Sequence, residues 1–377
     1  MKIAVAAETE AGEPRVAATP ETVKKMLGLG AEVAVEPGAG TKSGILDQDF
    51  TAAGASVRAD ATADADIVLK VRRPRASELS RYKKGAIVVA IMDPFGHEDA
   101  LRGIADAGVT AFAMELLPRI TRAQSMDVLS SQANLAGYRA VIDAAAEYGR
   151  ALPMMMTAAG TVPATKVFVM GAGVAGLQAI ATARRLGAIV TATDVRPAAK
   201  EQVESLGAKF IAVEDDEFRA AETAAGYAKE MSKDYQAKQA ALVAEHIKKQ
   251  DIVITTALIP GRPAPRLISA AMVSSMHPGS VLVDLAVERG GNVEGVKADT
   301  VADVGGVKIV GYSNMPGRLA ATASSLYAKN LLAFLDVLID KKTKTLSVNW
   351  DDEIVKATAL TRDGAIVHPN FKPKSAA

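Results

Sequence analysis

The sequence predicts an α/β protein with two domains, each built on a doubly wound parallel sheet, joined by long helices with a cleft between them. Three observations lead to this prediction. Short β-type runs alternate with helical stretches, which is typical of parallel sheets with helical crossovers. A glycine-rich turn at 171–176 leads from a strand-like run straight into a helical one. At 377 residues, the chain is long enough for two domains that each bury a core.

Composition excludes several classes of protein. The formal net charge is +1, so nothing indicates a nucleic acid or an anionic surface as partner. There are 0 cysteines, which excludes disulfides, thiolate metal sites and a cysteine nucleophile, and no metal site is expected. The start of the chain lacks a basic and apolar leader. No apolar run approaches the roughly 18 residues of a spanning helix, so the chain by itself is expected to be soluble.

The first domain is expected over residues 1–126, with residues 318–377 returning to it, and residues 127–317 are expected to form the second. The strand-like runs of the first domain are Ile3–Ala7, Glu32–Glu36, Ile67–Val71 and Ile87–Met92, and Pro20–Leu29 is helical with Gly30 as a C-cap. The second domain begins with a helix-compatible segment, Asp127–Leu152, whose small and apolar residues recur every three or four positions. This long helix is expected to connect the two domains.

The glycine motif lies in KVFVMGAGVAGLQAIATARRL, Lys166–Leu186. Gly171 permits a tight turn, Gly173 lets the backbone approach a pyrophosphate, and Gly176 lets helix and strand pack closely. The N-terminus of the helix then offers unpaired N–H groups to phosphates. The motif predicts a Rossmann-like dinucleotide-binding domain, and the alternative is an incidental glycine turn in a βαβ unit.

Asp194 ends the next strand-like run, Ala188–Thr193, at the spacing expected for the acid that binds ribose hydroxyls. A carboxylate here favours NAD, because it repels the 2′-phosphate of NADP. Arg196 follows two residues later and weakens this preference, since an Arg accommodates that phosphate. NAD is the expected cofactor.

Further strands are expected at Phe210–Val213, Ile252–Thr256, Val281–Leu285 and Lys308–Gly311, and a helix over Ser324–Ile339 returns the chain to the first domain. The nicotinamide end of the cofactor is expected in the cleft between the domains. The charged and Ala-rich segment Asp215–Gln250 has two interpretations, a pair of solvated surface helices or a mobile lid.

The segment Pro118–Ala140, PRITRAQSMDVLSSQANLAGYRA, resembles the NAD(H)-binding domain I of proton-translocating NAD(P)+ transhydrogenase. The resemblance extends through TAAGTVP at 157–163, GAGVAG, AETAAGYAKEM at 221–231, TTALIPGRPAP at 255–265 and VDLAVERGGN at 283–292. Alanine dehydrogenase, the sister family, shares the fold, the pattern Glu8…Arg15, the strand with Lys70, and NMPG.

One position separates the sister families. Alanine dehydrogenases resemble one another in placing a His, their general acid/base, after the strand that matches Ile87–Met92. This sequence has Asp93-Pro94 there, and His97 comes several residues late. The resemblance therefore favours the transhydrogenase, with Lys70 and Arg15 as structural ion-pair partners instead of substrate ligands.

The resemblance implies direct hydride transfer from NADH bound here to NADP+ on a partner domain III, in an Si/Re-specific transhydrogenase coupled to proton translocation by a separate membrane component. Such a step needs positioning groups and no acid or base, because two rings must approach to about 3–3.5 Å without water. Arg119, Gln124, Asp127 and Ser130 match the residues that contact nicotinamide in the family. The alternative for these four is a helix cap with solvated neighbours. We hypothesise that Arg119 and Asp127 exchange partners as the nicotinamide changes its charge.

For the rest of the cofactor, the resemblance implies contacts of Val174 with the pyrophosphate turn, and of Asp194, Val195 and Arg196 with the adenosine ribose. The implied adenosine and lid contacts are Gly226, Gln239 and Leu258. Tyr227 resembles the aromatic residue of the loop that closes over the nucleotide, and ordinary packing is the alternative.

The resemblance also implies partners. The chain ends at NFKPKSAA without a membrane helix, as in a soluble α1-type subunit. The transmembrane part is then expected on another polypeptide, and NADP(H) on domain III of a membrane β subunit. The chain is expected in the cytoplasm, peripherally associated with the inner membrane. A hairpin near Met154–Thr157 crosses to a second copy in the family, which implies a homodimer.

Two rival functions remain open. The first is an alanine-dehydrogenase-like amino-acid dehydrogenase, complete in itself. The second is a non-catalytic module that senses NAD and keeps only the glycine motif.

Overall fold

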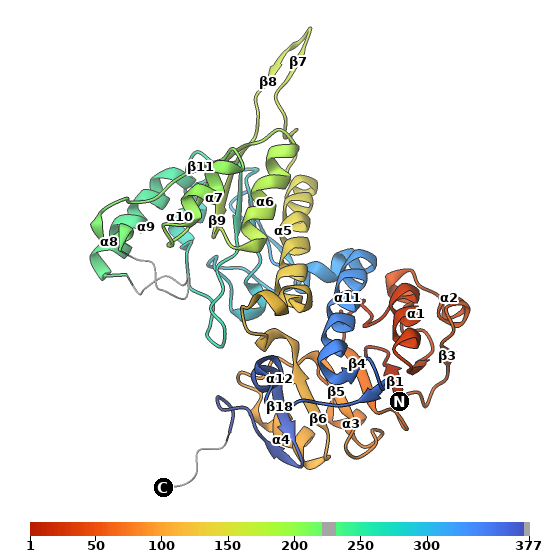
Figure 1. Cartoon of the computed structure of the whole chain (residues 1–377). Helices are drawn as coiled ribbons and strands as arrows, with labels where there is room; N and C mark the ends of the chain where they lie inside the picture. The colour runs from red at the N-terminus through yellow and green to blue at the C-terminus, as the bar shows by residue number, and fades with distance from the viewer. Residues whose placement is uncertain (221–230, 373–377) are drawn as a thin grey trace. The chain divides into compact units, whose positions relative to one another are not determined.

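The computed structural model describes residues 1–220 and 231–372. It divides into two compact units, Met1–Gln132 with the C-terminal segment from Pro316 onward, and Ala133–Met315. Each unit holds its own large sheet with helices around it (Figure 1). The predicted fold class, two Rossmann-like α/β domains, is confirmed.

The first unit is built on an eight-stranded sheet with the order β19-β18-β6-β5-β4-β1-β2-β3. Its strands are β1 (Lys2–Val5), β2 (Glu32–Val35), β3 (Ser56–Val57), β4 (Ile67–Arg72), β5 (Ile87–Ile91), β6 (Thr110–Ala113), β18 (Ala359–Arg362) and β19 (Ala365–Ile366). Its helices are α1 (Pro20–Gly28), α2 (Asp47–Ala52), α3 (Ala76–Leu79), α4 (Glu98–Asp106), α11 (Ala320–Leu338) and α12 (Glu353–Thr358). Short 3-10 turns are η1 (Thr41–Ser43), η2 (Met114–Leu116), η3 (Thr121–Met126) and η5 (Met315–Leu319), and β16 (Ile339–Asp340) pairs with β17 (Thr345–Leu346). Strands β18 and β19 are antiparallel additions that the sequence patterns did not reveal.

The second unit is built on a seven-stranded sheet with the order β11-β10-β9-β12-β13-β15-β14, in which β14 is the antiparallel edge strand. Its strands are β9 (Lys166–Met170), β10 (Ile189–Thr193), β11 (Lys209–Phe210), β12 (Ile252–Thr255), β13 (Val281–Asp284), β14 (Val301–Val304) and β15 (Val307–Val310). Its helices are α6 (Val174–Arg185), α7 (Ala199–Ser205), α8 (Asp216–Arg219), α9 (Lys233–Ile247) and α10 (Ala270–Ser274), with η4 (Val287–Arg289). Most of α5 (Val128–Glu147) also belongs to this unit.

Alternate residues of β9 enter two separate cores, which shows that helices cover both faces of this sheet. Val167 and Val169 pack with residues of α5 and α6, whereas Phe168 and Met170 pack with residues of α9 and α10. The parallel strands read as continuous apolar runs for this reason. The strand order reverses between β9 and β12, and ligands of such sheets bind beside the carboxyl ends of the strands at this switch point.

Candidate functional site

The turn after β9 depends on two of the predicted glycines. Gly171 has φ +103°, and its N–H donates to the carbonyl oxygen of Thr193 at 2.8 Å. A Cβ on Gly171 would lie 2.4 Å from Thr256 Oγ1, and a Cβ on Gly176 would lie 1.8 Å from the Gly171 carbonyl oxygen. Neither position accepts a side chain, because the obstacle at Gly176 is backbone that no rotamer change can move.

The middle glycine of the motif borders open space. Nothing of the chain lies within 4 Å of the position that a Cβ on Gly173 would take. Gly173 is the N-cap residue of α6 and provides no side-chain cap, so the first N–H groups of this helix have no partner within it. Exposed Val174 follows at the first turn. An open backbone cradle at a helix N-terminus fits a pyrophosphate by charge and by shape.

Asp194 ties the end of β10 to the glycine turn. Its Oδ2 accepts from the N–H of Ala172 at 2.7 Å, and its Oδ1 accepts from the N–H of Arg196 at 2.8 Å. The Arg196 guanidinium pairs with both oxygens, at 2.9 Å from Nε and 3.0 Å from the second terminal nitrogen. The acid therefore lies where a ribose acid is needed, and it holds Arg196 against itself.

The other predicted adenosine contacts surround the same edge of the sheet. Val195 and Leu258 are exposed apolar residues that follow β10 and β12. Gln239 of α9 accepts from the N–H of Val213 at 3.0 Å and donates to Thr193 Oγ1 at 3.0 Å, so its amide joins the loops after β10 and β11. Gly226 and Tyr227 lie outside the described residues.

Asp127 and Ser130, two of the four predicted nicotinamide contacts, are bonded to each other at the start of α5. Asp127 accepts from the Ser130 N–H at 2.9 Å and from the Ser130 hydroxyl at 2.5 Å. These bonds make Asp127 a cap of the helix N-terminus. In this structure its carboxylate therefore contacts Ser130 instead of Arg119. Gln124, in η3, and Arg119, just before η3, are both exposed. All four residues belong to the first unit.

Two side chains distant in sequence hold the η3 segment. Asn330 of α11 donates to the Ser125 carbonyl oxygen at 2.8 Å and accepts from the Ser131 hydroxyl at 2.7 Å. Arg122 donates to both oxygens of Asp352, at 2.7 Å and 2.8 Å. Sequence patterns gave no signal for Asn330 or Asp352, since their role arises from packing across about 200 residues.

Gly137 is a further residue of the second unit that the sequence patterns did not reveal. A Cβ at this position would lie 2.0 Å from the Ala175 carbonyl oxygen, so α5 crosses the first turn of α6 in backbone contact. Figure 1 shows the two helices side by side. An isolated glycine inside a long helical pattern is the signal that would have revealed it.

Arg15 and Lys70 are buried ion-pair partners, as expected from the sequence. Arg15 donates to both oxygens of Glu13 at 2.7 Å and to Gln132 Oε1 at 2.8 Å. Lys70 Nζ lies 3.0 Å from Glu78 and 3.5 Å from Glu8. Burial opposes ionisation of Glu13, but the pairing with Arg15 and Arg72 prevails and lowers the pKa of Glu13 to about 2.

The position after β5 holds a carboxylate and no imidazole. Asp93 has φ +46°, and its N–H and that of Met92 donate to the carboxylate of Glu115. Burial raises the pKa of Glu115 to about 7. His97 Nδ1 lies 2.9 Å from the Asp93 carbonyl oxygen, so its ring is engaged with the same turn. The residue expected of the sister family is therefore absent from this turn.

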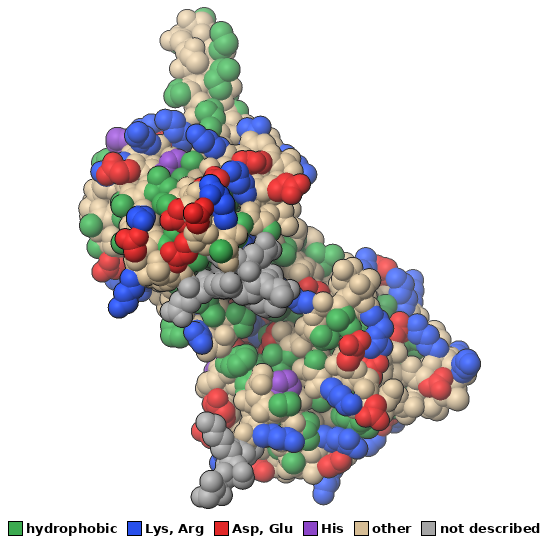
Figure 2. Space-filling model, turned by 60° about the vertical axis from the view of Figure 1, so that its left-hand side comes forward, with side chains coloured by type: hydrophobic (Ala, Val, Ile, Leu, Met, Phe, Trp, Pro, Cys, Tyr) green, Lys and Arg blue, Asp and Glu red, His purple; other side chains and the backbone are tan. Residues whose placement is uncertain are grey.

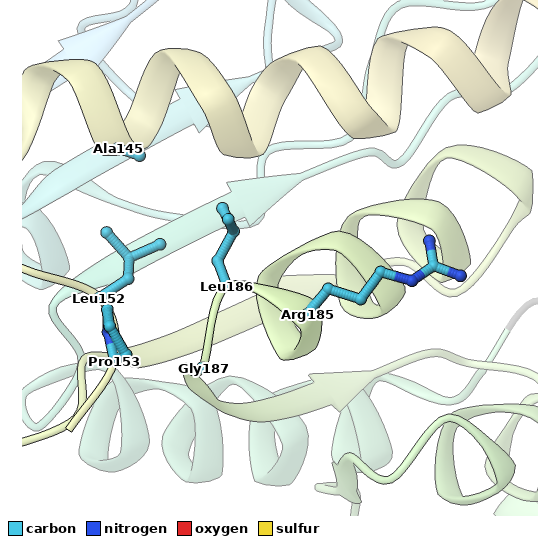
Figure 3. Close-up of a pocket in the computed structure, with 6 residues that line it drawn as sticks. All are labelled: Ala145, Leu152, Pro153, Arg185, Leu186 and Gly187. Atoms are coloured by element: carbon cyan, nitrogen blue, oxygen red, sulfur yellow. The ribbon is translucent and has the colours of Figure 1, made fainter. Parts of the chain in front are cut away.

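A hairpin of the second unit, β7 (Met155–Thr157) and β8 (Gly160–Val162), carries exposed methionines at 154, 155 and 156. Figure 1 shows it projecting from the rest of that unit, and Figure 2 shows hydrophobic side chains along it. At its base is a groove of about 490 Å³, lined by Ala145, Leu152, Pro153, Arg185, Leu186 and Gly187. Figure 3 shows the Arg185 guanidinium extending away from Leu152 and Leu186, which leaves the groove itself apolar.

Within residues 1–220 and 231–372, no helix combines the length and the apolar character needed to cross a bilayer. Over the same residues, no three His, Cys, Asp or Glu side chains form a group able to hold a metal ion.

Comparison with known proteins covers both units. Residues 4–136 match the model of the alanine dehydrogenase/PNT N-terminal domain, and residues 140–369 match that of the alanine dehydrogenase/PNT C-terminal domain. The chain is 56% identical to the first of the polypeptides that form NAD(P) transhydrogenase subunit alpha of Rhodospirillum rubrum, over 98% of each chain.

Two solved structures resemble the whole chain. A transhydrogenase from Sinorhizobium meliloti superposes with a TM-score of 0.90 at 64% identity, covering 97% of this chain and 100% of that one. An L-alanine dehydrogenase superposes with a TM-score of 0.82 at 26% identity, covering 98% of each. The resemblance stated from the sequence is confirmed, with alanine dehydrogenase as the more distant relative.

Proposed function

This chain belongs to the alanine dehydrogenase/PNT family, and we propose that within it the chain is the NAD(H)-binding component of a proton-translocating NAD(P) transhydrogenase. The observation that carries the proposal is the cradle of the second unit, where Gly173 borders open space and Asp194 spans the glycine turn. Asp93 in place of a histidine supports the transhydrogenase over the dehydrogenase, because amine oxidation needs a proton acceptor beside the substrate.

NAD(H) bound to this chain would supply or accept the hydride, and NADP(H) on a partner domain III would be the other participant. The residues of this chain would act by positioning. The N-terminus of α6 and Gly173 would hold the pyrophosphate, and Asp194 the adenosine ribose. Arg119, Gln124, Asp127 and Ser130 offer a cation, an amide, a carboxylate and a hydroxyl, which suit a carboxamide and a ring that changes its charge. No proton moves at these groups.

The proposal includes the partners and the place of work. A separate membrane component would translocate the protons, and a membrane β subunit would carry domain III. The chain would then lie on the cytoplasmic side of the inner membrane, associated with it through these subunits.

We also propose a homodimer in which each hairpin lies in the groove of the other copy. The hairpin leaves the unit directly after Leu152 and Pro153, which line the groove. A two-fold axis beside this point would therefore bring hairpin and groove together twice, as an isologous interface requires. Exposed methionines are adaptable apolar side chains that suit such a groove.

Replacing Leu186 or Met156 with Glu is expected to raise the dimer dissociation constant about 100-fold, because each change buries an unpaired charge in an apolar contact. Sedimentation velocity should show a dimer for the wild-type chain and monomers for both variants. Leu346→Glu is the matched control, since Leu346 is also an exposed leucine but lies in β17 of the first unit. A dimer that persists in both variants contradicts the proposed interface.

The function is tested by mixing the purified chain with a soluble NADP-binding domain III of a related transhydrogenase. Reduction of an acetylpyridine analogue of NAD by NADH should be rapid in the mixture with catalytic NADP(H), and absent with either protein alone. Oxidation of NADH with pyruvate and ammonia by this chain alone would assign it to the dehydrogenases instead. Binding of NADH without turnover in the mixture would favour a sensing module.

A further inference from the structure

We infer that Asn292 is a positioning residue of the dinucleotide site, which holds the loop at 257–265 against the carboxyl edge of the second sheet. This inference rests on the proposed function, because the loop carries Leu258, a proposed adenosine contact. Asn292 lies in the loop after β13 and is 0% exposed. It touches no proposed ligand contact directly and acts through the backbone of the neighbouring loop.

The Asn292 amide binds both ends of this loop. Its Oδ1 accepts from the Ala257 N–H at 3.1 Å, and its Nδ2 donates to the Ala257 carbonyl oxygen at 2.9 Å. The same Nδ2 donates to the Pro265 carbonyl oxygen at 2.8 Å. The Asn292 carbonyl oxygen also accepts from the N–H groups of Leu267 and Ile268, at 2.8 Å and 3.0 Å. One residue therefore fixes the points where the loop leaves and rejoins the domain.

Asp284, the last residue of β13, fixes Asn292 in turn. It is 0% exposed, and it accepts from the N–H groups of Ala286 at 2.8 Å and Val293 at 2.9 Å. The loop from 285 to 293 is thus closed on a buried carboxylate. Gly291, with φ +79°, is required there, since a Cβ would lie 2.8 Å from Asp284 Oδ2 and 2.3 Å from Val296 Cγ1. The Asn292 amide thereby has a rigid support.

The opposite side of the 257–265 loop is bonded to the glycine turn. Thr256 Oγ1 donates to the Gly171 carbonyl oxygen at 3.1 Å. The loop is therefore tied to the pyrophosphate turn at one side and to Asn292 at the other. Its exposed residues include Leu258 and Ile259. Apolar side chains on a loop that is already ordered bind a ligand without the entropic cost of ordering it.

Asn292→Asp keeps the shape of the side chain but removes the two donated hydrogen bonds. The Ala257 and Pro265 carbonyl oxygens then lose their partner, so the loop loses its anchorage. We expect the Kd for NADH to rise about tenfold, corresponding to one or two buried hydrogen bonds. The Kd for AMP should rise by the same factor, because the loop would contact only the adenosine half. Asn292→Ala should give the same pattern.

Gln250→Ala is the matched control. Gln250 is a buried amide of the same unit, which donates to the His246 carbonyl oxygen at 3.2 Å just before the amino end of β12. It is expected to lower the melting temperature about as much as Asn292→Ala, with unchanged Kd values for NADH and AMP. A loss of affinity in the Asn292 variants alone separates positioning from a general loss of stability.

Amide hydrogen exchange of the free protein gives a second readout, which does not depend on the identity of the ligand. The Ala257 N–H should exchange at least tenfold faster in both Asn292 variants and at the wild-type rate in Gln250→Ala. Wild-type exchange at Ala257, or an NADH affinity within twofold of wild type in both Asn292 variants, would overturn the inference. A wild-type chain that binds no NADH would refute the proposed function, and the exchange rates would still decide whether Asn292 anchors the loop.

Discussion

Gly176→Ala is expected to abolish dinucleotide binding and to destabilise the second unit by about 3 kcal/mol or more, at the upper end of overpacking costs. The added Cβ would lie 1.8 Å from the Gly171 carbonyl oxygen, so α6 and the turn must move apart. This displacement would break the bond from the Gly171 N–H to the Thr193 carbonyl oxygen, and the bond that Thr256 donates to Gly171. The Kd for NADH should rise at least 100-fold.

Gly173→Ala separates the ligand from the fold. Nothing of the chain meets a Cβ at Gly173, so the free energy of unfolding should stay within about 1 kcal/mol of wild type. NADH binding should still weaken at least tenfold, since the methyl group would occupy the space proposed for the pyrophosphate. Gly28→Ala, in α1 of the first unit, also meets open space and serves as the control that changes neither quantity appreciably. Thermal unfolding and fluorescence titration of NADH measure both effects. Unchanged NADH binding in Gly173→Ala would contradict the proposed site.

The local parts of the fold were predictable because each depends on residues close in sequence. The run Val167–Met170, the turn at Gly171 and the start of α6 follow from strand propensity, backbone freedom and helix periodicity within about 20 residues. Asp194 was found because its distance from the glycine turn is set by one helix and one strand. The prediction of a helix to Leu152 was too long, since α5 ends at Glu147 with Gly149 close behind.

The supporting contacts were not predictable from the sequence because they join distant segments. Asn292 anchors a loop that begins 35 residues earlier, and Asn330 holds Ser125 across 205 residues. Strands β18 and β6 pair only because the chain returns after the whole second unit. Nothing in the local pattern around either asparagine distinguishes it from a solvated one. Only the three-dimensional structure shows that their amides are buried and bonded at both ends.

Asp127→Asn is expected to slow hydride transfer about 10- to 100-fold while changing the Kd for NADH less than threefold. The structure gives Asp127 a local role as well, because it accepts from the Ser130 N–H and caps α5. Asparagine is an equally good N-cap, so this variant removes the charge and keeps the cap. The charge is what our hypothesis requires, since a carboxylate responds to the charge that nicotinamide gains as NADH is oxidised.

Asp127→Ala provides the complementary variant, because it removes both charge and cap. It should slow hydride transfer as much as Asp127→Asn and should also cost about 1 kcal/mol of stability, the usual effect of losing an N-cap. Asp340→Asn is the control: Asp340 accepts from the N–H groups of Lys342 and Thr343 in the same unit but is no proposed contact. Single-turnover rates with domain III, NADH titration and thermal unfolding measure the three quantities. If Asp127→Asn weakens binding and hydride transfer by equal factors, then Asp127 only binds the ring, and its charge has no separate role in the transfer step.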